Sequence, residues 1–275
     1  MITAGFLLDA HLRAHRRLGP SARRCGLVAW RNVTALRSAY WLVVVSGFVE
    51  PLLYLLSIGV GVGALIGQIS LPDGRIVDYA MFVAPAMLGA SAMNGATVES
   101  TFHFFSKLKY MRLYDAMLVT PLRPAELVLG ELAWSVGRGA IYSAEFLAVM
   151  VAMKLTTLTR ALAALPAAML VSAAFGALGI VTTTYARSWR DFDLVGAAQF
   201  ALFVLSGTFF PTSVYPAVVR LMVELTPLIH AVRLLQDIAI GRMHATTFVH
   251  AGYLAVVTVA GTIAAGRRVG RLLLT

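Results

Sequence analysis

The sequence is poor in charged residues. Asp, Glu, Lys and Arg make up 13% of its 275 residues, while hydrophobic residues make up 59%. A soluble domain carries about a quarter charged residues and uses them to cover its surface. This composition excludes an ordinary soluble fold. It predicts an integral membrane protein whose apolar surface lies in lipid.

Cysteine and the common catalytic motifs are also scarce. Cys25 is the single cysteine, which excludes an internal disulfide framework. None of the three lysines follows a glycine, so a phosphate-binding loop is missing and we expect the chain not to bind ATP itself. No H-E-x-x-H motif or G-x-S-x-G elbow occurs. We therefore expect no catalytic residue, no metal site and no cofactor bound by this chain.

The formal net charge of +10 would indicate a nucleic-acid partner in a soluble protein. In a membrane protein the position of the cations matters more, because cytoplasmic loops are enriched in Lys and Arg. With both termini placed in the cytoplasm, the inner segments hold 16 of the 23 cations and the outer segments hold six. The charge distribution therefore predicts a multi-pass protein of the cytoplasmic membrane with both termini inside, and membrane lipid rather than nucleic acid as its surroundings.

Apolar stretches of about 20 residues are long enough to cross the hydrocarbon core. The sequence holds six candidates within one domain over 1–275. The predicted spans are 39–66, 79–103, 128–153, 161–185, 194–210 and 248–266. We thus predict an all-α integral membrane protein with six transmembrane helices.

An amphipathic stretch precedes the first span. Across 26–38, apolar residues and arginines recur on different sides of a helical projection. This pattern favours an N-terminal interfacial helix in the inner headgroup layer, with an ordinary charged flank as the alternative.

The stretch between the fifth and sixth spans is too apolar for an aqueous loop and is broken by Pro211, Pro216 and Pro227. Proline lacks an amide donor and ends a helix, so we expect Pro211 to end the fifth span. Thr226 and Pro227 form a helix-start pattern, and Gly241 forms a stop. These signals predict a re-entrant outer helical hairpin over 211–241, with a plain extracellular loop as the alternative.

Two ionisable residues fall inside predicted spans at similar depth. Glu50 and Arg138 each lie about 15 Å from the inner surface at 1.5 Å per residue. Charges at such depth are costly unless paired. We expect an intramembrane Glu50–Arg138 pair, which could either hold two helices together or contact the substrate.

Three stretches together give the chain its resemblance to a known family. They are "FVEPLLYLLSIGVGVG" (48–63), "YDAMLVTPLRPAELVLGELAW" (114–134) and "LSGTFFP…P…LTPLIHAVRLL" (205–235). In order and spacing, the sequence resembles the permease subunits of type-2 ABC exporters, in the branch of nodulation protein J and its polysaccharide- and drug-exporting relatives.

The resemblance implies a coupling helix over 105–121 that docks on a separate ABC ATPase dimer, where ATP and Mg would be bound. The coupling residues it implies are Tyr114, Asp115, Ala116, Met117, Leu118, Thr120 and Pro121. From the sequence itself, Met111, Leu113, Met117 and Leu118 are expected to form an exposed apolar face with a basic edge. The resemblance also implies a second permease copy or a paralogous permease, and an outer hairpin that lids the export path.

The function favoured by these features is outward transport of an amphipathic substrate, such as a lipid-linked saccharide or a hydrophobic drug. A membrane-embedded lipid or glycosyl transferase would need clustered acids, histidines or metal ligands, which are missing. A channel or secondary transporter would predict more polar spans or internal repeats, and we find no convincing repeat.

Overall fold

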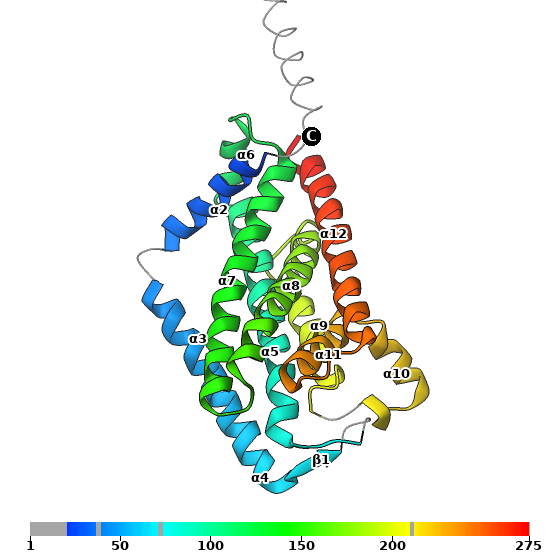
Figure 1. Ribbon diagram of the computed structural model, residues 1–275. Helices are drawn as coiled ribbons and strands as arrows, with labels where there is room; N and C mark the ends of the chain where they lie inside the picture. The colour runs from blue at the N-terminus through cyan, green and yellow to red at the C-terminus, as the bar shows by residue number, and fades with distance from the viewer. Residues whose placement is uncertain (1–20, 37–39, 71–73, 210–211, 275) are drawn as a thin grey trace, which may run out of the picture.

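Long helices running between two ends make up most of the protein (Figure 1). The computed structural model describes residues 21–36, 40–70, 74–209 and 212–274. One end carries the helices α2 (Ala22–Leu36) and α6 (Leu113–Leu118) and the last turns of α12 (Ala245–Leu274). We call this the α6 end.

The opposite end, which we call the hairpin end, carries the only strands in the described residues. They are β1 (Gln68–Ser70) and β2 (Ile76–Asp78), which pair antiparallel. The hairpin connects the first long helical stretch to the second, so these two stretches run in opposite directions through the molecule.

The long helical stretches follow the predicted order. The first, 40–66, consists of α3 (Tyr40–Tyr54), the π-helical η1 (Leu55–Val62) and α4 (Gly63–Ile66). The second, Tyr79–Tyr110, which we call the long helix, contains α5 (Tyr79–Val98) and the π-helical η2 (Glu99–His103) and η3 (Ser106–Tyr110). The others are α7 (Pro124–Ala152), α8 (Leu158–Thr183), α9 (Asp191–Leu205) and α12. By length and composition, three described helices could cross a membrane: Tyr79–Tyr110, Leu158–Thr183 and Ala245–Leu273. The predicted class, an α-helical membrane protein, is confirmed, while the count of six spans stays a prediction.

Small residues let the central helices approach closely. A Cβ added to Gly179 of α8 would lie 1.9 Å from the Ser100 hydroxyl, and one on Gly139 of α7 would lie 2.2 Å from the Ser172 hydroxyl. In lipid, where apolar side chains gain little from leaving the solvent, such close backbone packing is a main source of helix association. Gly and Ser therefore determine where α8 crosses α7 and the helix Tyr79–Tyr110.

The end of α9 differs from the prediction. The span was expected to reach Phe210 and stop at Pro211, but α9 ends at Leu205. Gly207 then adopts a φ of 73°, and the Ser206 hydroxyl donates a hydrogen bond to the Phe203 carbonyl. A left-handed glycine and a serine that caps the helix end it before any proline is reached. Pro211 itself lies outside the described residues.

Two short helices join α9 to α12, after the 3-10 turn η4 (Thr212–Val214). They are α10 (Ala217–Glu224) and α11 (Pro227–Ile240). Pro216 directly precedes α10 and Pro227 is the first residue of α11, positions where a missing amide hydrogen costs no helical bond. Helix α11 begins after Thr226 and ends before Gly241, whose φ is 81°, so these predicted boundaries are confirmed.

The two helices differ in burial. Most of α11 is buried, and it packs on α5, α8 and α12. On α10, Val218, Leu221 and Met222 are each more than 60% exposed. One helix of the predicted hairpin is thus part of the core and the other covers little of it, while the entry of either into lipid stays a prediction.

Helix α2 lies obliquely against α7 at the α6 end (Figure 1). A Cβ on Gly130 of α7 would lie 2.5 Å from the Val28 Cβ and 2.7 Å from the Cys25 carbonyl oxygen. Glu126 of α7 is fully buried and stabilises this contact. It accepts hydrogen bonds from the Ser21 amide at 2.8 Å and from Arg24 at 2.9 Å. The helix extends over Ala22–Leu36 against the predicted 26–38, and its place in the headgroup layer stays a prediction.

We predict that Gly130→Val loosens α2. The larger side chain should weaken the packing of α2 on α7 by about 1–3 kcal/mol, which is the usual cost of overpacking. A loss of about 1.4 kcal/mol raises the population with α2 detached tenfold. The single thiol of Cys25, which is half-buried on α2, should then react with a maleimide about tenfold faster. Gly137→Val is the matched control, because the same helix has open space there. Equal labelling rates in the two variants would contradict the packing of α2 on Gly130.

Candidate functional site

The predicted coupling segment, 105–121, begins in the last turns of the second long helical stretch. After Tyr110 the chain reverses at Arg112, whose φ of 45° lies in the left-handed region, and α6 follows. This conformation is costly for a residue with a side chain, so it marks a sharp reversal. The prediction of one helix over 105–121 is corrected here. The segment is the end of a long helix, a turn and a six-residue helix.

Tyr114 anchors α6 in the protein. Its side chain is fully buried, and its ring lies 5.0 Å from that of buried Phe104 at the end of the long helix. The same core cluster includes Leu127 of α7 and Val269 of α12. A displacement of α6 therefore has to move the ends of three long helices.

The outward face of the segment differs from the predicted one. Of the residues implied by the resemblance, those on the surface are Asp115, Ala116, Thr120 and Pro121. Met117 and Leu118 are only half-exposed, since Met117 packs on the core around Tyr114. The expected apolar face is thus partly turned inward. Of the predicted face, Met111 is exposed (68%), and Val119 (89%) and Tyr110 (62%), which were not predicted, are exposed as well.

An aromatic cluster connects this segment to α9. The Tyr110 ring stacks on Trp189 with centroids 5.4 Å apart, and Phe105 meets Trp189 and Phe192 edge to face, each at 5.0 Å. Trp189 lies in the α8–α9 connection and buried Phe192 in the first turn of α9. Because α9 makes few other close contacts, these rings are its main attachment at the α6 end.

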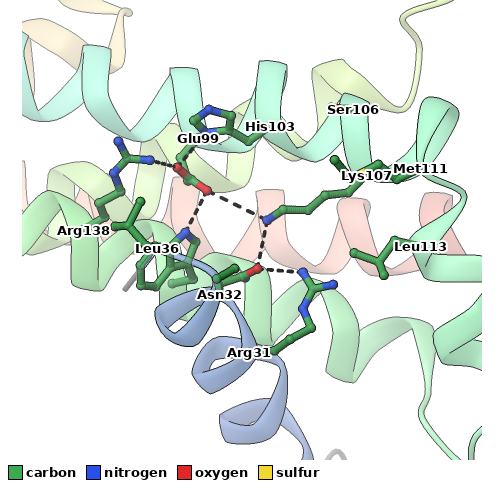
Figure 2. Close-up of a pocket in the computed structure, with 12 residues that line it drawn as sticks. Arg31, Asn32, Leu36, Glu99, His103, Ser106, Lys107, Met111, Leu113 and Arg138 are labelled. Atoms are coloured by element: carbon green, nitrogen blue, oxygen red, sulfur yellow. Dashed lines mark hydrogen bonds and ion pairs between the residues drawn. The ribbon is translucent and has the colours of Figure 1, made fainter. Parts of the chain in front are cut away.

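A cluster of charged side chains lies between α2, the long helix and α7 (Figure 2). At its centre is Glu99, whose side chain is 5% exposed. It forms an ion pair with Arg138 and accepts hydrogen bonds from Trp134 Nε1 at 2.7 Å and His103 Nδ1 at 2.8 Å. A buried carboxylate is tolerated when donors of this kind surround it.

The second acid of the cluster is Glu131, which is 4% exposed. It accepts from Lys107 Nζ at 2.7 Å and from Asn32 Nδ2 at 3.0 Å, and Arg31 lies 3.5 Å away. Lys107 also lies 3.9 Å from Glu99 and thereby joins the two halves. Through these contacts α2 is tied to both the long helix and α7.

Beside the cluster is a cavity of about 350 Å³. Its charged lining consists of Arg31, Glu99, Lys107 and Arg138, with His103 beside them (Figure 2). Cations outnumber acids in this lining, and Leu36, Met111, Leu113 and Trp134 add apolar surface. A cavity so composed can receive a polar or anionic group attached to an apolar one.

The predicted intramembrane pair is not tested. Arg138 pairs with Glu99 and donates to the Tyr142 hydroxyl at 3.2 Å. Glu50 lies in α3, and its side chain is outside the described residues. The Glu50–Arg138 pair therefore stays a prediction. The sequence analysis missed Glu99, although Glu99, His103 and Lys107 recur every four residues and so share one helix face.

Metal binding finds no support in the described part of the chain, where no group of three or more His, Cys, Asp or Glu side chains is placed to hold an ion.

Comparison with known proteins gives consistent relatives. The family described as ABC-2 type transporter matches residues 23–240. Nodulation protein J of Rhizobium leguminosarum bv. trifolii is 32% identical over 232 residues, covering 84% of this chain and 87% of the relative. Proteins of the same name from R. leguminosarum bv. viciae and Rhizobium meliloti (strain 1021) are 29% and 28% identical, covering 84% of this chain and 88% and 84% of their own.

We predict that Arg138 is coupled energetically to Glu99. Removing one partner of a buried pair costs about 3–5 kcal/mol, and contacting residues couple by about 0.5–3 kcal/mol. Arg138→Gln and Glu99→Gln should each lower the thermal stability of the purified protein, and the double variant should lose less than the sum. For comparison, the same three measurements are made with Arg138→Gln, Glu50→Gln and their double variant. A larger coupling of Arg138 to Glu50 than to Glu99 would refute the pair described here.

Proposed function

The chain belongs to the ABC-2 type transporter family, and from this we propose that it is the transmembrane permease subunit of an ATP-driven exporter. The exporter would move an amphipathic substrate outward across the cytoplasmic membrane. A separate ABC ATPase dimer would bind ATP and Mg and dock on the α6 end.

The observation that carries this proposal is the burial of Tyr114. A docking helix can transmit force only if it is fixed to the helices it must move. Tyr114 fixes α6 to the ends of the long helix, α7 and α12. Beside it, exposed Val119, Met111 and Tyr110 offer an apolar surface of the kind that fills a partner's groove.

The aromatic cluster supplies a second route for the movement. Tyr110 lies just before the turn at Arg112 that leads into α6, and its ring contacts Trp189, which precedes α9. The C-terminal end of α9 is followed by η4, α10 and α11. ATP-driven motion of α6 would therefore be passed to the predicted outer hairpin, which includes Pro216 and Pro227.

The proposed orientation places the α6 end in the cytoplasm, with both termini on that side. It is supported by the excess of Lys and Arg in the predicted inner segments and by the last turns of α12 lying at the same end as α6.

The proposed substrate has a polar head and an apolar part, such as a lipid-linked or acylated saccharide or a hydrophobic drug. The cavity beside Glu99 and Lys107 combines cations with apolar side chains, which suits such a molecule at the inner membrane surface. The relatives named nodulation protein J favour the saccharide class.

A second permease, either another copy or a paralogue, is proposed to cover α3 and α9. On α9, Leu194 and Phe200 are 76% and 68% exposed, and on α3 Leu53 is 61% exposed.

We predict that Val119→Asp abolishes most ATPase binding. Val119 is 89% exposed, so the change should leave the fold intact while placing a charge in the docking surface. Copurification with the ATPase should fall by about tenfold or more. Val214→Asp, at a 70% exposed valine of η4, is the control. Undiminished copurification of the Val119 variant would refute docking on this surface.

We also predict that Trp189→Ala separates ATP hydrolysis from transport. The substitution removes ring contacts with Phe105, Tyr110 and Phe192 but leaves α6 in place. ATP turnover of the reconstituted complex should persist, while export into the opposite compartment should drop severalfold. Trp30→Ala serves as the control, since Trp30 is 64% exposed on α2, outside the surfaces proposed for the second permease. Export at the wild-type rate would rule out the aromatic route.

A further inference from the structure

A second pocket lies against β2 and the α7–α8 connection. These elements lie toward the hairpin end, away from the α6 end (Figure 1). It has a volume of about 480 Å³. Its walls come from β2, the α7–α8 connection, the first turn of α8 and the end of α11. Three stretches that are distant in the sequence, 75–81, 151–160 and 239–240, thus meet around one space.

The chain holds this pocket in a defined shape. The Thr156 hydroxyl donates to the Ala239 carbonyl at 3.0 Å and ties the α7–α8 connection to the end of α11. Lys154 has a φ of 59°, an unfavourable conformation that turns the connection sharply. Gly241 has a φ of 81°, and a Cβ there would lie 2.7 Å from an Arg160 guanidinium nitrogen. Glycine at this position therefore leaves the room that Arg160 occupies.

Three cations line the pocket, and they come from three segments. Arg75 precedes β2, Lys154 lies in the α7–α8 connection and Arg160 lies in the first turn of α8. No acidic side chain occurs among the described residues of the lining. Lys154 and Arg160 would attract a bound anion, because opposite charges lower the electrostatic free energy when they meet. The first turn of α8 adds the partial positive charge of a helix N-terminus.

Apolar side chains flank the cations. Ile76, Leu158 and Leu162 are 65%, 62% and 63% exposed, and Leu158 and Leu162 lie one turn apart on α8. Leu158 and Ile76 belong to the pocket lining itself. One part of a ligand in this pocket would therefore contact the cations, and a neighbouring part would contact the apolar side chains.

We propose that this pocket binds a phosphate group, carried by the headgroup of an anionic membrane lipid. The guanidinium of Arg160 can hold phosphate oxygens in a planar fork, and Lys154 adds a point charge. The acyl part lies along Leu158 and Leu162. The site does not involve α6 or the cavity beside Glu99, so it stands independently of the proposed transport function.

The experiment uses the full chain in lipid nanodiscs. Thermal unfolding is compared between phosphatidylcholine alone and an equal mixture of phosphatidylcholine and phosphatidylglycerol, and in phosphatidylcholine with added inorganic phosphate. The test variant carries Lys154→Asn and Arg160→Gln, and asparagine tolerates the left-handed backbone at position 154. Arg187→Gln with Arg190→Gln, which removes two exposed cations between α8 and α9, is the control.

The wild type and the control should gain about 2–4 °C in Tm in the mixed lipid, and the test variant should gain nothing. A pocket-dependent gain with inorganic phosphate alone would show that the site takes the free anion without the lipid chain. Equal gains in all three proteins, or no gain in any, would overturn the proposal. If the double variant does not fold in phosphatidylcholine, Arg160→Gln alone replaces it under the same criteria.

Discussion

Two carboxylates withdrawn from solvent constrain the α6 end of this protein. Glu99 and Glu131 are each about 5% exposed or less, and an isolated charge in such a place would be prohibitively costly. Their partners come from α2, the long helix and α7. Burial of the acids therefore favours one arrangement of the three elements, because separating any of them would remove donors from a buried charge. Tyr114 then places α6 against that arrangement through apolar contacts.

The rest of the bundle is held by different means. Gly139, Gly176 and Gly179 allow α7, α8 and the long helix to pack with little space between backbones. Helix α9 lacks this close packing and depends on the rings of Trp189 and Phe192. The protein thus combines a tightly packed centre with a more loosely attached helix, and loosely packed parts of a protein open more readily.

Local chemistry made several features predictable. Pro227 and Gly241 bound α11 because a missing donor and a left-handed residue act on their own neighbours. The end of α9 was missed because Gly207 stops the helix before the more conspicuous Pro211 is reached. The inward direction of Met117 and the partnership of Arg138 with Glu99 were missed for another reason: both depend on how helices meet in space. The coarse order of helices followed from hydropathy, whereas side-chain partners needed the tertiary structure.

The π-helical winding of Glu99–His103 and Ser106–Tyr110 has one further consequence. Each such turn contains an additional residue, so the helix there is wound more loosely than an α-helix. Tightening it by a single residue would rotate everything beyond by roughly 100°. The Tyr110 ring and the turn at Arg112 could thus swivel about the helix axis while the membrane-embedded part of the same helix kept its neighbours.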